Sequence, residues 1–113
     1  MKTEIPGLIM TMQPTVAVAQ HLLVAPDGTL ADSVKPIGVA LESGIIGEDT
    51  PICLNGIVLV VCASAVTKGD LLIASSGKVA TNALASVADL SKACGIALDA
   101  GAASDDIIRM KIL

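Results

Sequence analysis

Apolar and polar residues alternate along several short stretches of this 113-residue chain. In the C-terminal run DDIIRMKIL, Ile108, Met110 and Ile112 alternate with Arg109 and Lys111. Side chains two positions apart share one face of a β-strand, so this period of two predicts a strand with one buried face. The run IVLVVCA is apolar at every position, which predicts a strand that is covered on both faces.

The chain repeats part of its pattern. HLLVAPDGTLA and DLLIASSGKVA each place a glycine-containing turn between two apolar runs, which is typical of β-hairpins. ADSVKPIGVALESGIIGED (residues 31–49) then matches ADLSKACGIALDAGAASDD (residues 88–106). The second copy lies 49 residues further along at the hairpin (Gly28 to Gly77) and 57 at the later match (Asp49 to Asp106), so it contains an eight-residue insertion. These matches predict a tandem duplication, with pseudo-repeats at about residues 15–50 and 64–113.

Two related β units in one small domain are expected to close on each other about an approximate two-fold axis, which also removes exposed strand edges. The predicted fold is all-β, a compact barrel or two-sheet sandwich built from two tandem-duplicated β units. One short helix is predicted over residues 83–94, where apolar residues recur at three-residue steps. This single domain is expected to span residues 15–113.

An N-terminal arm, residues 1–14, precedes the domain and has no evident counterpart in the second copy. It contains prolines and the apolar run LIMTM. The arm is expected either to add a strand to its own domain or to reach a partner, whose sheet it could extend by main-chain pairing. Ile5, Leu8 and Ile9 are the expected apolar anchors. The full set of residues expected at a partner interface is Lys2, Glu4, Ile5, Pro6, Leu8, Ile9, Met10 and Met12.

The composition favours contacts with other chains. Hydrophobic residues make up 53% of the sequence and charged residues 16%, yet Phe, Tyr and Trp are absent. The mean hydropathy is +0.78. A small domain this apolar is expected to bury part of its surface against partners or copies of itself, so a homo-oligomer or an assembly component is predicted.

The charge pattern argues against two other classes of partner. The net charge is −4, the seven basic residues are scattered, and there are no aromatic rings to stack on bases, so direct nucleic-acid binding is not expected. Residues 50–67 are uncharged, but proline, asparagine and glycine interrupt them and their apolar core is too short to span a bilayer as a helix. No membrane association is predicted, and no cleaved leader is expected at the N-terminus.

Few residues could support catalysis or metal binding. The only histidine, His21, directly precedes a predicted strand, where a structural role is expected; a Cys–His nucleophile or a zinc site would need partners that the spacing does not supply. The acidic pairs 48–49 and 105–106 could hold a hard cation but also suit turns. We predict no catalytic residue, metal or cofactor, and therefore no enzyme. The cysteines expected to be buried and reduced are Cys53, Cys62 and Cys94.

One alternative concerns lysine. Lys68-Gly69-Asp70 before an apolar strand is a turn that also occurs in lipoyl and biotinyl carrier domains, which are likewise quasi-symmetric duplications. Such domains present a modifiable lysine at a hairpin tip, and Lys68 and Lys78 are the candidates here. A carrier, or another small β binding module, therefore stays open as an alternative function.

Finally, VTKGDLLIASSGKVAT (residues 66–81), a short predicted helix and CGIALDAGAASDDIIRMKIL (residues 94–113) resemble the capsid cement, or head decoration, proteins of tailed bacteriophages. The resemblance implies a structural virion protein without catalysis, made in the host cytoplasm and bound to the capsid exterior, often as a homotrimer. Its implied partner is the major capsid protein, whose neighbouring subunits it would clamp.

Overall fold

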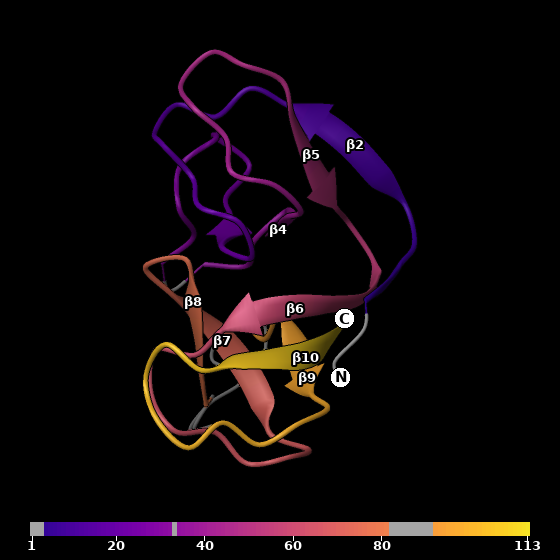
Figure 1. The fold of residues 1–113 in the computed structure, drawn as a ribbon, viewed down its shortest axis with the longest axis vertical. Helices are drawn as coiled ribbons and strands as arrows, with labels where there is room; N and C mark the ends of the chain where they lie inside the picture. The colour runs from indigo at the N-terminus through magenta and orange to yellow at the C-terminus, as the bar shows by residue number, and fades with distance from the viewer. Residues whose placement is uncertain (1–3, 33, 82–91) are drawn as a thin grey trace.

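The computed structural model describes residues 4–32, 34–81 and 92–113. Within these ranges all regular structure is β, which confirms the predicted all-β class. The strands form two antiparallel sheets, of order β1-β6-β10-β9-β7-β8 and β2-β5-β4-β3 (Figure 1). The strands are β1 (Ile5–Pro6), β2 (Ile9–Met12), β3 (Leu23–Val24), β4 (Gly38–Ala40), β5 (Thr50–Cys53), β6 (Gly56–Val61), β7 (Leu71–Ser75), β8 (Lys78–Thr81), β9 (Gly95–Ala97) and β10 (Ile107–Ile112).

The helix predicted over residues 83–94 falls almost entirely outside the described residues and stays a prediction. Of its expected last turn, Lys92 lies in a turn, and Ala93 and Cys94 are buried where the chain enters β9.

The side-chain alternation read from the sequence is present in the strands. In β10, Ile108 and Met110 are fully buried, whereas Lys111 is exposed. In β6, Val58 and Val60 are buried while their neighbours are only half-buried, so one face of this strand packs more tightly than the other. The apolar run through β6 was expected to be covered on both faces, and the structure covers one completely.

A continuous aliphatic core lies between the sheets. Because the chain has no aromatic residue, many small branched side chains fill this space. A second, smaller cluster lies within the unit of the four-stranded sheet and is built on Val18, Val24, Ala40 and Ile52. The main cluster joins Leu23, Val39 and Cys53 of the four-stranded sheet to Val58, Val60, Leu72, Val79, Ile108 and Met110 of the six-stranded sheet.

The strand order of the smaller sheet recurs within the larger one. The order β2-β5-β4-β3 corresponds to β6-β10-β9-β7, while β1 and β8 are added at the two edges. The pairing register agrees as well. In the smaller sheet, Ile9 lies opposite Cys53. In the larger sheet, Ile57 lies opposite Lys111. Ile57 follows Ile9 by 48 residues and Lys111 follows Cys53 by 58 residues, so the two pairs correspond. The two units therefore share their order and their register.

This correspondence differs in two details from the one expected from the sequence. The N-terminal arm does have a counterpart, because β2 takes the place in its sheet that β6 takes in the other. The hairpin match is also shifted by one residue, because the sequence match aligned Leu22 with Leu71. In the structure, Leu23 pairs with Val39 and Leu71 pairs with Ile96, so Leu23 corresponds to Leu71. Such agreement is what a tandem duplication would produce, and the duplication itself stays a prediction.

Candidate interaction surface

The N-terminal arm crosses from one sheet to the other. In β1, Ile5 lies opposite Ile57 at the edge of the six-stranded sheet, and in β2, Met12 lies opposite Thr50 at the edge of the four-stranded sheet. Figure 1 shows the arm running along the outer margin of the molecule. Of the two roles expected for the arm, it fills the first, since it adds a strand to each sheet of its own domain.

Asn55 fixes the point at which the arm crosses. Its main-chain oxygen accepts a hydrogen bond from the Gly7 amide at 3.0 Å, and its side-chain Oδ1 accepts one from the Leu8 amide at 2.6 Å. The Leu54 amide donates to the Leu8 carbonyl at 2.8 Å. Three hydrogen bonds therefore hold the backbone of the arm at the crossing to the loop between β5 and β6.

Most of the side chains predicted for a partner interface point to solvent. Ile5 is 64% exposed, Leu8 61%, Ile9 46% and Met10 36%. A single exposed aliphatic residue is ordinary, but four within six consecutive residues concentrate exposed apolar surface on the arm, which is typical of contact surfaces. We call these four residues the arm patch. Of the remaining predicted residues, Pro6 is exposed, Met12 packs partly on the smaller core cluster, and Lys2 lies outside the described residues.

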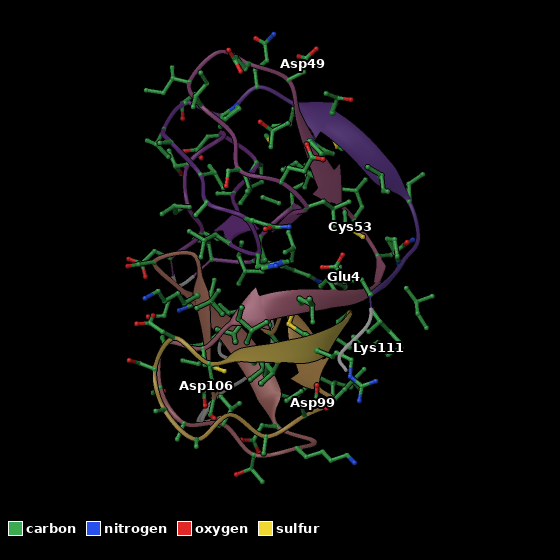
Figure 2. All side chains as sticks on the ribbon, in the orientation of Figure 1. Glu4, Asp49, Cys53, Asp99, Asp106 and Lys111 are labelled. Carbon is green, nitrogen blue, oxygen red and sulfur yellow. The ribbon has the colours of Figure 1, made fainter. Side chains whose placement is uncertain are left out.

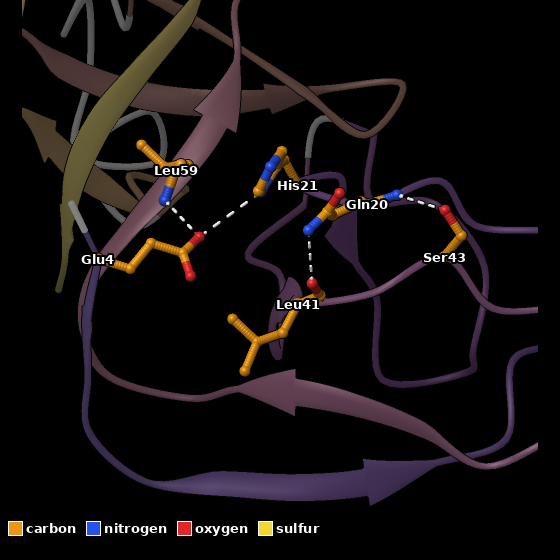
Figure 3. Close-up of polar contacts among 6 residues, drawn as sticks. All are labelled: Glu4, Gln20, His21, Leu41, Ser43 and Leu59. Carbon is orange, nitrogen blue, oxygen red and sulfur yellow. Dashed lines mark hydrogen bonds and ion pairs between the residues drawn. The ribbon is translucent and has the colours of Figure 1, made fainter. Parts of the chain in front are cut away.

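Glu4, also predicted at the interface, instead turns inward (Figures 2 and 3). Its Oε1 accepts a hydrogen bond from the Leu59 amide at 3.2 Å and lies 3.6 Å from Nδ1 of His21. The side chains of Glu4 and His21 are only 25% and 15% exposed. Glu4 thus anchors the arm to β6, and His21 is largely buried beside it.

A second apolar feature was missed in the sequence. Ile45 and Ile46, in the loop between β4 and β5, are 57% and 67% exposed. The loop is held at its base, where the Gly47 amide donates to the Pro14 carbonyl at 3.2 Å. Ala102 and Ala103 occupy the corresponding positions of the second unit. The difference between two isoleucines in one loop and two alanines in the other was the sequence signal that could have revealed this site. We call Ile45 and Ile46 the isoleucine tip.

The net negative charge of the chain is carried by the unit that forms the four-stranded sheet. Residues 9–53 contain five carboxylates and a single basic residue, Lys35, so they account for the whole net charge of −4. Asp49 accepts a hydrogen bond from Gln13 directly after β2, and Figure 2 places it at that end of the molecule. The five carboxylates, all exposed, are those of Asp27, Asp32, Glu42, Glu48 and Asp49.

The groups considered for catalysis or metal binding do not converge in the described residues. The three cysteines are free and buried, as expected. Burial raises the pKa of the Cys94 thiol to about 11, which makes it a poor nucleophile at neutral pH. His21 faces Glu4, and no group of three potential metal ligands occurs within the described ranges. Those ranges also contain no helix that could cross a membrane.

The two lysines weighed for a carrier function differ in their surroundings. Lys78, at the start of β8, forms an ion pair with Asp105 at 2.5 Å. Lys68 is exposed in the turn before β7. Neither lysine lies at the tip of the hairpin that joins β7 to β8, which is formed by Ser76 and Gly77.

Comparison with known proteins agrees with the all-β fold. The sequence matches a family described as phage cement protein over residues 2–112. The crystal structure of the N base of head fiber gp8.5 from bacteriophage phi29 is similar, with a TM-score of 0.74 over 94% of this chain and 93% of that chain. The two sequences are 19% identical, so this likeness concerns the fold. No curated protein matches the chain.

Proposed function

Because the chain belongs to the phage cement protein family, whose members are structural and capsid-associated, we propose that it binds the capsid exterior and clamps neighbouring major capsid subunits. This role requires no catalysis. The observation that carries the proposal is the arm patch, where Ile5, Leu8 and Ile9 project from a backbone that is hydrogen-bonded into both sheets.

Clamping requires two separate contact surfaces on one molecule. The arm patch lies along the outer margin of the sheets, and the isoleucine tip lies in the loop that precedes β5 (Figure 1). The molecule extends 36 × 34 × 24 Å along its principal axes. In the proposed role, one apolar surface contacts one capsid subunit and the other contacts its neighbour.

The rigidity of the arm favours this use. A disordered arm would lose conformational entropy when it binds, whereas an arm already fixed by Asn55 and β6 loses little. Apolar area removed from water contributes about 25 cal/mol per Å², so a few half-exposed aliphatic side chains give a modest energy for each molecule. Many such contacts over a shell add to its stability, and copies joined in an oligomer bind with further avidity.

The test is binding to purified shells that lack this protein. A variant with Ile5→Ser, Leu8→Ser and Ile9→Ser removes the exposed side chains but keeps the main-chain pairing. We expect its affinity for shells to fall at least tenfold while its melting temperature stays near that of the wild type. Ile107→Ser is the matched control, because Ile107 is 42% exposed in β10 and belongs to neither surface. Wild-type binding by the triple variant would refute the proposed contact.

We further propose that the protein acts as a homotrimer, the state that its family resemblance implies. Light scattering would then give a solution mass near three times the 11.3 kDa of one chain. If the trimer forms only on the shell, the free protein would be monomeric and the bound copies would occur in threes.

A further inference from the structure

β2 presents an open strand edge. The hydrogen bond from the Leu54 amide to the Leu8 carbonyl shows that residue 8 faces β5. Because main-chain groups alternate in direction along an antiparallel pair, Met10 also faces β5, while the N–H and C=O groups of Ile9 and Thr11 point away from the sheet. Within the described residues these outward groups meet no other strand, and Figure 1 shows β2 at the outer margin.

The matching edge of the other sheet is covered. Ile57 and Leu59 of β6 stand 48 residues after Ile9 and Thr11, and they occupy the same places in the shared register. Ile57 pairs with Ile5 of β1, and the Leu59 amide donates to the Glu4 carboxylate at 3.2 Å. The protein thus shows on its own β6 what fits this edge. It is a short, extended, antiparallel segment in which an apolar residue, Ile5, pairs with the strand and a carboxylate oxygen accepts from the next outward amide.

The other sheet edges are protected. β1 is two residues long and ends in Pro6. β3 is paired on its outer side, where the Ala31 amide donates to the Leu23 carbonyl at 3.0 Å. β8 is likewise covered, since the Ala63 amide donates to the Val79 carbonyl at 2.8 Å. β2, by contrast, is four residues long and contains neither a charge nor a proline, the two features that usually block strand addition.

The charge around β2 restricts what can bind there. The unit that contains β2 carries the net charge of −4, and Asp49 lies directly beyond its C-terminal end, bonded to Gln13. Two copies that joined through their β2 edges would bring two such units together, which is electrostatically unfavourable. A segment with Lys or Arg beside its apolar residues would instead be attracted.

We propose that β2 accepts an extended segment of the shell protein as an additional antiparallel strand, bonded to the main chain of Ile9 and Thr11. The segment has apolar side chains that contact the arm patch and at least one flanking basic residue that faces the acidic unit. This inference rests on the proposed function and adds to it the mode of binding and the chemistry of the partner segment.

The test uses Thr11→Pro in the full chain. Proline removes the outward N–H of residue 11 and blocks strand addition, but it removes no bond to β5, and proline is tolerated at edge positions of this kind. Thr11→Val is the matched control, because it changes the side chain and keeps the N–H. We expect Thr11→Pro to bind purified shells at least tenfold more weakly than wild type, and Thr11→Val to bind within about twofold.

Hydrogen exchange on the wild-type chain gives a second measurement in case Thr11→Pro folds poorly. The amides of Ile9 and Thr11 should exchange rapidly in the free protein and at least tenfold more slowly on shells, while the Met10 amide is protected in both states. If the wild type does not bind shells, the proposed function fails and this inference fails with it. If the wild type binds but Ile9 and Thr11 stay unprotected, or if Thr11→Pro only abolishes self-association, the inference alone is overturned.

Discussion

The main-chain amide of Leu59 donates a hydrogen bond to the carboxylate of Glu4 at 3.2 Å, across 55 positions of sequence. This bond closes the edge of β6 beyond the end of β1 and ties the N-terminal arm to the sheet. The bond explains why Glu4 is turned inward although its neighbours in the arm face solvent.

We predict that Glu4→Ala destabilises the fold by about 1–2 kcal/mol, since it leaves the half-buried Leu59 amide without its charged acceptor. Urea denaturation would measure the change. Glu4→Gln keeps a hydrogen-bond acceptor and should lose clearly less stability. An Ala variant as stable as the wild type would mean that the bond does not secure the arm.

Two glycines at corresponding positions of the two units, Gly38 and Gly95, are predicted to be equally sensitive to substitution by alanine. A methyl group on Gly38 would press on the Cys53 carbonyl, and one on Gly95 would lie 2.7 Å from the Lys111 carbonyl, which is the corresponding atom of the second unit. Gly38→Ala and Gly95→Ala should therefore each destabilise the protein, by about 1–3 kcal/mol. Thermal unfolding would measure both. Gly47→Ala meets no neighbouring atom and controls for the general loss of a glycine, although its positive φ adds some strain.

The Cys94 thiol predicts a dependence of stability on pH. Burial raises its pKa from 9.0 to about 11, because the folded interior disfavours the charged thiolate. The unfolded chain loses this proton first as the pH rises, so the contribution is intact below about pH 9 and is lost as the pH approaches 11. In Cys94→Ala, the fall in stability between these two pH values should be smaller than in the wild type. An identical fall in both proteins would contradict the assignment to Cys94.

The same burial predicts that a thiol reagent does not label the native protein at pH 8. All three cysteines are buried, and only thiolates react readily. After unfolding in urea, three thiols per chain should react. Rapid labelling of the folded protein would show that its interior opens more often than the packing suggests.

Local patterns in the sequence were enough to predict much of the fold. The alternation around Ile108 and Met110 identified the strand β10, and the Gly-containing turn after Ala74 identified the β7–β8 hairpin. Both features depend on residues close together in the chain. The one-residue error in matching the two units arose because Leu22-Leu23 and Leu71-Leu72 look alike in sequence, while only hydrogen bonding to β4 and β9 distinguishes them.

The position of the candidate interaction surface was predictable only in part. The apolar residues of the arm patch were identified because prolines set the arm apart from the repeated units. The inward turn of Glu4 was not predictable, since it depends on Leu59 and His21, which are distant in sequence. The open edge of β2 likewise depends on which strands become neighbours, and no local pattern encodes that.

The isoleucine tip supports the last prediction. Ile45 and Ile46 are largely exposed, whereas the second unit has Ala102 and Ala103 in the corresponding loop, so the fold does not need the larger side chains there. The double variant Ile45→Ala and Ile46→Ala should therefore unfold at the wild-type temperature, or slightly above it.

If the tip is the second contact of the clamp, this variant should still bind isolated major capsid subunits through the arm patch but should stabilise assembled shells less against heat. The matched control is Ala102→Ser with Ala103→Ser, which alters the corresponding loop and should leave shell stabilisation unchanged. Calorimetry of decorated shells would measure the difference. Full stabilisation by the isoleucine-to-alanine variant would mean that the arm patch alone binds the capsid, because a clamp cannot work with one of its two contacts removed.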